Sequence, residues 1–224
     1  MPDRKQHADL ALLDTIVAPD DDGADGVALV TDQGTISCRL HAADGGDAAV
    51  LWVFGAGGGL GGPAGGVYER LGRQLAGEGT TSLQVDYRRP ASLLPCVLDV
   101  RAGLAFLASR GCTRVVLVGH SFGGAVVISA GAASDAVIAV AALSSQSSGT
   151  QDVAALAPRP LLVAHGTDDE VLPDRTSRDI HARARDPKRL ILYPGCRHGL
   201  DACRDALDRD LLAWIREVVA PTRA

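Results

Sequence analysis

Residues 115–127 read VVLVGHSFGGAVV, and this stretch holds the clearest evidence for the architecture of the chain. The four aliphatic residues 115–118 are typical of a strand that is buried on both faces of a sheet. The segment Gly119-His120-Ser121-Phe122-Gly123 then predicts a sharp turn, and residues 124–127 continue as an apolar helix. The pattern G-x-S-x-G in a strand–turn–helix setting indicates a nucleophilic serine. A glycine-rich turn whose serine only caps the helix is the simpler alternative.

The predicted turn places the hydroxyl of Ser121 at the start of a helix, above the carboxyl end of a strand. At that position the backbone N–H of Phe122 can stabilise an oxyanion that develops beside the serine. A serine hydroxyl is a weak nucleophile until a base takes its proton. The rest of the chain must therefore supply a base.

Apolar runs and helical segments alternate on both sides of this stretch. We predict strands at residues 49–54, 82–87, 114–119, 136–143, 160–164 and 189–193, and helices at residues 67–76, 93–109, 122–133, 175–184 and 206–219. This alternation predicts an α/β fold, a mostly parallel central sheet with helices on both faces. Residues 27–30 and 35–40 predict an N-terminal antiparallel hairpin. We expect one domain over residues 27–220 without a cap domain, and an acidic lead-in at residues 1–26 that is loose or partly helical.

Composition narrows the class of protein. The chain has 224 residues, of which 46% are hydrophobic, and this is enough for one core. The net charge of −5 argues against nucleic acid or an anionic membrane surface as a partner. No apolar run approaches the ~18 residues of a membrane span, and residues 1–9 lack the apolar stretch of a signal peptide. The five cysteines are irregularly spaced and suggest reduced thiols in the cytoplasm. No motif predicts a metal or a cofactor.

Sites in such sheets form at the carboxyl ends of the strands. Of the six histidines, His198 lies in a glycine-bounded loop after the last predicted strand, which makes it the best base. Residues 165–173, HGTDDEVLP, follow the preceding strand and offer three consecutive acids, Asp168, Asp169 and Glu170. The chain order of serine, acid and histidine is that of α/β-hydrolases. Spacing alone does not separate Asp168 from Asp169.

Four segments together carry a resemblance to a known family: residues 54–58, the turn at Ser121, residues 165–173 and residues 195–199. The chain resembles the α/β-hydrolase superfamily, and within it the small lidless enzymes near the dienelactone hydrolases. The resemblance implies that Asp169, the fifth residue of an H-G-x-x-D-x-x-x-P segment, is the acid. It also implies that the backbone N–H of Ala56 is the first oxyanion donor, although Phe54 replaces the usual histidine. Dienelactone hydrolases proper use a cysteine nucleophile, so Ser121 argues against that exact activity.

The sequence thus predicts a serine hydrolase that cleaves a small carboxylic ester or thioester through an acyl-enzyme on Ser121. Its partner would be a small-molecule substrate, and the sequence does not indicate an oligomeric state. The residues that flank the motifs and could line a substrate pocket are Leu60, Arg88, Ser144, Leu172 and Leu200. For the leucines, ordinary core packing is an equal alternative. Arg88 could bind a substrate carboxylate or form an ion pair, for example with Asp86.

Two other functions remain open. Residues 57–62 also match G-x-G-x-x-G, and Asp86 ends the next strand, so a nucleotide-binding oxidoreductase that uses the loop of residues 55–66 is one alternative. Residues 63–66 separate this motif from the helix that should meet the pyrophosphate, which weighs against it. The other alternative is a hydrolase fold that binds a small molecule without catalysis.

Overall fold

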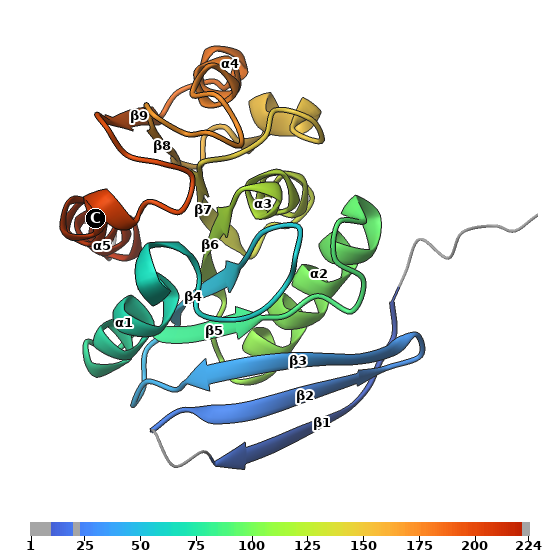
Figure 1. The fold of residues 1–224 in the computed structure, drawn as a ribbon. Coiled ribbons are helices and arrows are strands. Elements are labelled where there is room, and N and C mark those ends of the chain that lie inside the picture. Colours follow the sequence, from blue (N-terminus) through green and yellow to red (C-terminus); the bar gives the residue numbers. More distant parts are fainter. Residues whose placement is uncertain (1–9, 20–22, 221–224) are drawn as a thin grey trace, which may run out of the picture.

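The computed structural model describes residues 10–19 and 23–220. Within these residues, nine strands form one sheet in the order β1-β2-β3-β5-β4-β6-β7-β8-β9 (Figure 1). The strands are β1 (Leu12–Pro19), β2 (Asp25–Thr31), β3 (Gly34–His41), β4 (Ala48–Val53), β5 (Thr81–Val85), β6 (Arg114–His120), β7 (Val137–Leu143), β8 (Leu161–Gly166) and β9 (Lys188–Tyr193). Strands β4 to β9 pair in parallel, whereas β1, β2 and β3 are antiparallel. The expected mostly parallel sheet and N-terminal hairpin are therefore confirmed.

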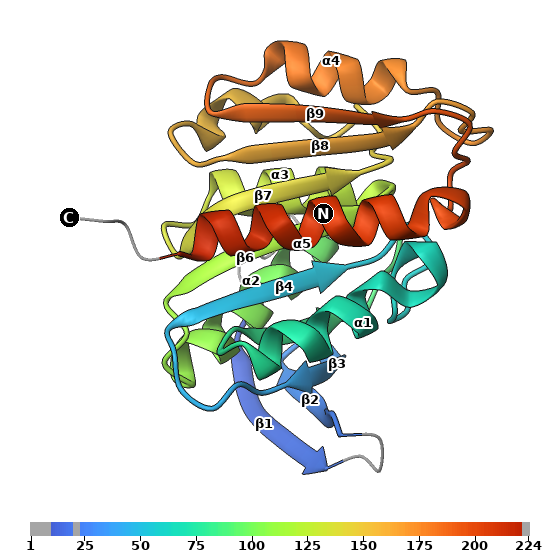
Figure 2. The ribbon, with the colours of Figure 1, turned by 90° about the vertical axis from the view of Figure 1, so that its left-hand side faces the viewer.

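Helices cover both faces of the sheet (Figures 1 and 2). They are α1 (Pro63–Gly77), α2 (Leu93–Ser109), α3 (Phe122–Ala132), α4 (Arg175–Arg183) and α5 (Arg204–Val219), with short 3₁₀ helices η1 (Gln151–Leu156) and η2 (Asp201–Cys203). Helices α1 and α5 pack on one face, and α2, α3 and α4 pack on the other. Between β7 and β8 the described chain forms only η1, so no cap domain is inserted there, as expected. No helix in the described ranges is long and apolar enough to cross a membrane.

Burial on both faces explains why the central strands are continuous apolar runs. Every residue of β4 and β5 is buried, and so is every residue of β6 after Arg114. The core divides into two clusters, one on each side of the sheet. Such strands need helices above and below them, and the βα connections supply these helices.

The first strand corrects our expectation for the lead-in. Residues 12–19, which we expected to be loose or partly helical, form β1 and pair antiparallel with β2. This edge strand leaves Leu13, Ile16 and Val17 exposed, so the sequence lacks the alternation that marks a half-buried strand. The rest of the lead-in, residues 1–9 and 20–22, lies outside the described residues, and the domain boundary at residue 27 stays a prediction.

The cysteines also depart from expectation. Cys38, Cys96 and Cys112 are buried free thiols, but Cys196 and Cys203 form a disulfide. The expectation of reduced thiols is therefore wrong for this pair, whose members come together because η2 turns the chain back after residue 200. The cytoplasmic location stays a prediction, and it can no longer rest on the cysteines.

Candidate active site

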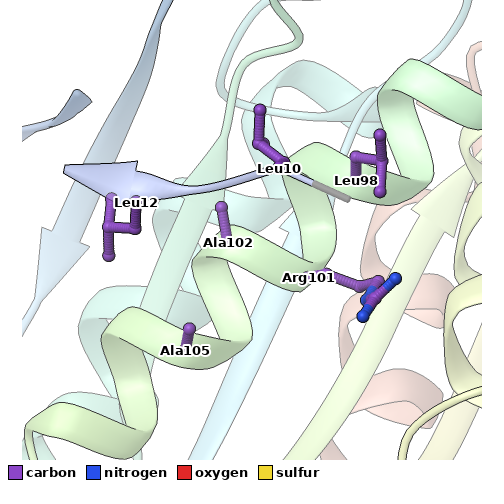
Figure 3. Close-up of a pocket in the computed structure, with 6 residues that line it drawn as sticks. All are labelled: Leu10, Leu12, Leu98, Arg101, Ala102 and Ala105. Atoms are coloured by element: carbon purple, nitrogen blue, oxygen red, sulfur yellow. The ribbon is translucent and has the colours of Figure 1, made fainter. Parts of the chain in front are cut away.

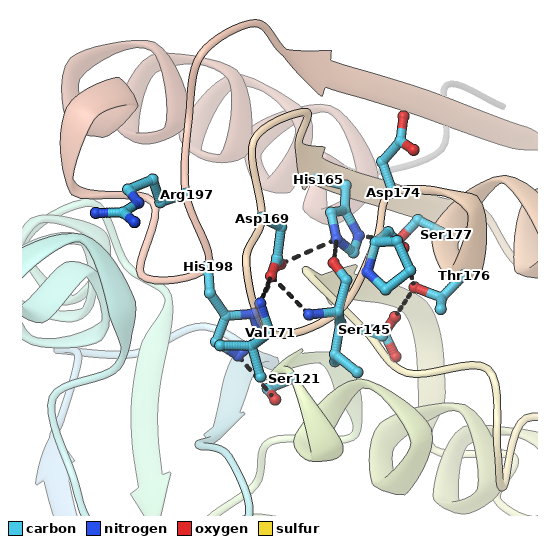
Figure 4. Close-up of polar contacts among 12 residues, drawn as sticks. Ser121, Ser145, His165, Asp169, Val171, Asp174, Thr176, Ser177, Arg197 and His198 are labelled. Carbon is cyan, nitrogen blue, oxygen red and sulfur yellow. Dashed lines mark hydrogen bonds and ion pairs between the residues drawn. The ribbon is translucent and has the colours of Figure 1, made fainter.

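Three side chains meet at the carboxyl edge of the parallel strands. Ser121 directly follows β6, Asp169 follows β8 and His198 follows β9. His198 Nε2 lies 3.1 Å from the hydroxyl oxygen of Ser121, and His198 Nδ1 lies 2.7 Å from a carboxylate oxygen of Asp169 (Figure 4). The structure thus brings together the three residues that the sequence analysis selected.

The turn that carries Ser121 needs glycine on both sides. Ser121 has φ of 57° and ψ of −121°, a strained conformation for a residue with a side chain. A Cβ on Gly119 would overlap the carbonyl of Gly123, and a Cβ on Gly123 would overlap the carbonyl of Phe54. Only glycine fits these close backbone approaches, which explains the G-x-S-x-G spacing physically.

The geometry distinguishes Asp169 from its neighbour. The Asp169 side chain is 0% exposed, and its Oδ1 accepts hydrogen bonds from the N–H groups of Val171 and Leu172. Burial raises the pKa of Asp169, but the bonds from Leu172 N–H, His198 and Val171 N–H together lower it below the ordinary value. The carboxylate is therefore ionised. Asp168 is exposed and accepts a hydrogen bond from Thr167 instead.

The hydrogen bonds fix the tautomer of His198. An ionised carboxylate only accepts hydrogen bonds, so His198 Nδ1 must carry the proton that faces Asp169. The lone pair of Nε2 then faces the Ser121 hydroxyl, which can donate to it. This is the arrangement that lets an imidazole remove a serine proton.

The loop of His198 is held at several points. The His198 carbonyl accepts a hydrogen bond from His120 Nε2 at 2.9 Å, and the Gly199 carbonyl accepts one from the N–H of Ala64 at 2.7 Å. Leu200 is fully buried, and the Cys196–Cys203 disulfide closes a ring around the loop. Burial lowers the pKa of His120 to about 4, so His120 is neutral and supports the loop as a donor.

Two backbone N–H groups near Ser121, those of Ala56 and Phe122, are the candidate oxyanion donors. Phe122 is the first residue of α3, and the first N–H groups of a helix have no partner within it. A Cβ on Gly55 would lie 3.5 Å from the Ser121 Cβ, so the backbone that leads to Ala56 passes next to the serine. Among the described residues, neither Ala56 N–H nor Phe122 N–H donates a hydrogen bond outside regular elements.

The five residues expected in the substrate pocket have different surroundings. Leu60 is 39% exposed and Leu172 is half-buried, whereas Leu200 is fully buried in the core. Ser144 is also fully buried, and its hydroxyl has no hydrogen-bond partner within the described part of the chain. Their burial therefore favours packing as the role of Leu200 and Ser144.

The side chain of Arg88 is engaged inside the protein. Its side chain is 6% exposed and forms an ion pair with Asp99, which is 0% exposed on α2. The Arg88 backbone N–H also donates to Asp99, at 2.9 Å. Of the two roles considered for Arg88, the structure therefore replaces the pocket role with the ion pair, and the partner is Asp99 in place of Asp86.

Backbone N–H groups in the glycine loop, residues 55–66, are hydrogen-bonded to other residues of this chain. Asp86 accepts a hydrogen bond from the N–H of Gly59, and Gln84 accepts one from the N–H of Gly61 at 2.7 Å. The N–H of Tyr68, in the first regular turn of α1, donates to the carbonyl of Gly61. These N–H groups are thus engaged within the chain and are not available to the phosphates of a dinucleotide.

Sequence reasoning missed one member of the site. His165, at the end of β8, contacts Asp169 through its Nε2 at 3.0 Å. The spacing of His165 and Asp169 could have indicated this contact, because residues four apart in a tight loop after a strand can meet. However, the same pattern also fits a histidine buried for packing.

A separate cavity of about 220 Å³ lies between β1 and α2 (Figure 3). Its lining consists of Leu10, Leu12, Leu98, Arg101, Ala102 and Ala105. Since no residue of the candidate site lines it, the cavity plays no part in the chemistry considered below.

Comparison with known proteins places the chain in a family. The model of the dienelactone hydrolase family matches residues 76–214, more than half of the chain. The chain belongs to the dienelactone hydrolase family. This confirms the resemblance seen in the sequence and agrees with the expectation of a hydrolase.

Curated relatives match over a short segment. The chain is 43% identical over 58 residues to the uncharacterized protein YfhR of Escherichia coli, covering 26% of this chain and 20% of that protein. It is 40% identical over 58 residues to the bifunctional esterase/perhydrolase DCH of Acinetobacter calcoaceticus, covering 25% of this chain and 21% of that protein. The matched segments thus span about a fifth of the length of these relatives.

Solved structures match over nearly the whole chain. A dienelactone hydrolase from Anabaena variabilis superimposes with a TM-score of 0.74 and 16% identity, covering 87% of this chain and 97% of that one. A serine hydrolase without a lid from Xanthomonas campestris gives a TM-score of 0.67 and 18% identity, covering 92% and 99%. At these identities the likeness establishes the fold, which is that of a lidless α/β-hydrolase.

Proposed function

We propose that this protein hydrolyses small carboxylic esters or thioesters through an acyl-enzyme on Ser121. The observation that carries the proposal is the hydrogen-bonded line from Ser121 Oγ through His198 to Asp169. Membership of a hydrolase family supports it, as does the esterase activity named for the relative in Acinetobacter calcoaceticus.

In the first half of the reaction, Ser121 Oγ attacks the carbonyl carbon of the ester. His198 Nε2 takes the serine proton as the bond forms, and Asp169 stabilises the resulting imidazolium. The N–H groups of Ala56 and Phe122 hold the negative oxygen of the tetrahedral intermediate. The imidazolium then returns its proton to the leaving alcohol or thiol, and the acyl group remains on Ser121.

Water completes the reaction. His198, neutral again, removes a proton from a water molecule that attacks the acyl carbon, and the same N–H groups hold the second oxyanion. Collapse of this intermediate releases the acid and returns the proton to Ser121. The chain between β7 and β8 forms only η1, which leaves the site uncovered from that side and favours small or flexible acyl groups.

The test combines labelling with kinetics. The protein, Ser121→Ala and His198→Ala are treated with a fluorophosphonate probe and measured by intact mass, and hydrolysis of p-nitrophenyl acetate is followed in parallel. We expect one adduct on the unaltered protein and none on either variant, with a loss of about 10⁴- to 10⁶-fold in kcat. Ser148→Ala, an exposed serine on another loop, is the matched control and should react normally.

Two outcomes would count against the proposal. If Ser121→Ala kept its rate of hydrolysis, the nucleophile would be a different residue. If the unaltered protein formed no adduct and cleaved no ester, the fold would serve to bind a small molecule without catalysis.

A further inference from the structure

A second histidine contacts the same carboxylate oxygen that faces His198. His165, at the end of β8, places its Nε2 3.0 Å from Asp169 Oδ2 and 2.9 Å from the carbonyl oxygen of Leu172. Its other ring nitrogen, Nδ1, lies 2.6 Å from the hydroxyl oxygen of Ser177 on α4. Figure 4 shows His165 between Asp169 and Ser177, on the side of the carboxylate away from Ser121.

The partners of His165 fix its proton. A carbonyl and a carboxylate only accept hydrogen bonds, so Nε2 must carry a hydrogen, which it donates to the Leu172 carbonyl while Asp169 Oδ2 lies 3.0 Å away. The Ser177 hydroxyl can then donate to Nδ1, which leaves the ring neutral. His165 and Ser177 are both 0% exposed, and a neutral ring avoids the cost of a buried charge.

Both oxygens of the Asp169 carboxylate therefore have polar neighbours on each side. Oδ1 accepts from two backbone N–H groups, at 2.8 Å from Val171 and 2.7 Å from Leu172. Oδ2 accepts from His198 at 2.7 Å, and on its other side it lies 3.0 Å from His165 Nε2. Without His165, the side of Oδ2 that faces away from His198 would be buried without a polar neighbour, and His198 alone would contact that oxygen.

We propose that His165 is a positioning residue that, held by Ser177, locks the Asp169 carboxylate toward His198 and moderates its charge. The inference rests on the proposed function, because it assigns His165 a role in the reaction that Asp169 and His198 would perform. His165 does not touch the substrate, since its side chain is fully buried.

Loss of the donor should have two kinetic consequences. The misaligned carboxylate orients the imidazole less well, so kcat should fall by about 10- to 100-fold, the usual effect of removing a hydrogen bond to a charged group, with KM unchanged. The negative charge on Oδ2 would also act on His198 alone and favour its protonated form. The acidic limb of kcat/KM against pH should therefore move to higher pH.

The experiment compares two variants at one position. His165→Gln places an amide N–H near the position of Nε2 and should keep most of the rate and the pH profile. His165→Phe cannot donate and should show both kinetic changes. Ser177→Ala should give an intermediate loss, because His165 then lacks the donor that fixes its tautomer. His181→Gln, a partly exposed histidine on α4, is the matched control and should behave as the unaltered protein.

A measurement on the unaltered protein makes the test independent of variant folding. Nitrogen-15 NMR of the histidine rings should show His165 with its hydrogen on Nε2 and a hydrogen-bonded Nδ1. A hydrogen on Nδ1 with bare Nε2 would overturn the proposal, as would a folded His165→Phe with unchanged kcat and pH profile.

The two proposals fail in different ways. If Ser121→Ala remained active, the proposed hydrolytic mechanism would be wrong whatever His165 does. If Ser121→Ala were inactive while His165→Phe matched the unaltered protein, only the role of His165 would be refuted.

Discussion

The disulfide between Cys196 and Cys203 offers a quantitative test of how the His198 loop is held. The two cysteines are seven positions apart, so the bond closes a ring of eight residues that includes His198. Cys203→Ser removes the bond with a change of one atom, at a position that is partly exposed. Packing losses should therefore be small, and the effect should come from opening the ring.

The expected loss of stability follows from ring size. In the chain-entropy relation, closing a ring of about eight residues removes about 8 cal/mol/K from the unfolded chain, or about 2.5 kcal/mol at 25 °C. For a domain of this length, that loss corresponds to a drop in Tm of about 5–10 °C. A misplacement of a catalytic group by 1 Å costs about 100-fold in rate. Because the hydrogen bonds to the carbonyls of His198 and Gly199 remain in the variant, the loop should shift by less than this. The fall in kcat should therefore stay below about tenfold.

The assay is thermal unfolding with and without dithiothreitol, together with ester hydrolysis at 25 °C. Reduction of the unaltered protein should lower Tm as Cys203→Ser does, whereas the variant itself should be indifferent to the reductant. Equal Tm values for the unaltered protein and the variant would refute the reasoning. So would five titratable thiols in the unaltered protein, denatured without reductant.

Two further predictions concern the supporting residues. Burial lowers the pKa of His120 from 6.5 to about 4, so below pH 6.5 the unfolded chain takes up a proton that the folded protein does not. The free energy of unfolding should therefore fall as the pH falls, by about 2 kcal/mol at pH 5. Urea denaturation of His120→Gln should lack this loss, and an identical loss in the variant would contradict the role of His120. Arg88→Met leaves Asp99 buried without its partner and should cost about 3–5 kcal/mol in urea denaturation, with the preference between anionic and neutral esters unchanged. A changed preference would restore a pocket role for Arg88.

The fold was largely predictable because its signals are local. Strands buried on both faces appear as apolar runs, and helix α2 has the predicted bounds, Leu93–Ser109. The strand β1 was not predictable in this way. It lies at the sheet edge with most of its side chains exposed, so neither face leaves a pattern in the sequence.

The candidate site was predictable to the extent that motifs specify it. The turn at Ser121 requires glycines at fixed offsets, and the loops of Asp169 and His198 follow strands whose carboxyl ends share one edge. The choice between Asp168 and Asp169 needed the resemblance, and the structure separates them by burial. The contact of His165 with Asp169 depends on the path of the loop, which spacing does not describe.

The sequence by itself determined the alternation of strands and helices, the strained turn at Ser121 and the chain order of serine, acid and histidine. These follow from the pattern of apolar residues and from the conformations that glycine permits. Only the tertiary structure decided that Arg88 pairs with Asp99, that Cys196 pairs with Cys203, and that His165 shares the carboxylate of Asp169. Each of these contacts depends on the angle at which a loop or helix meets its neighbour, and packing of the whole core sets that angle.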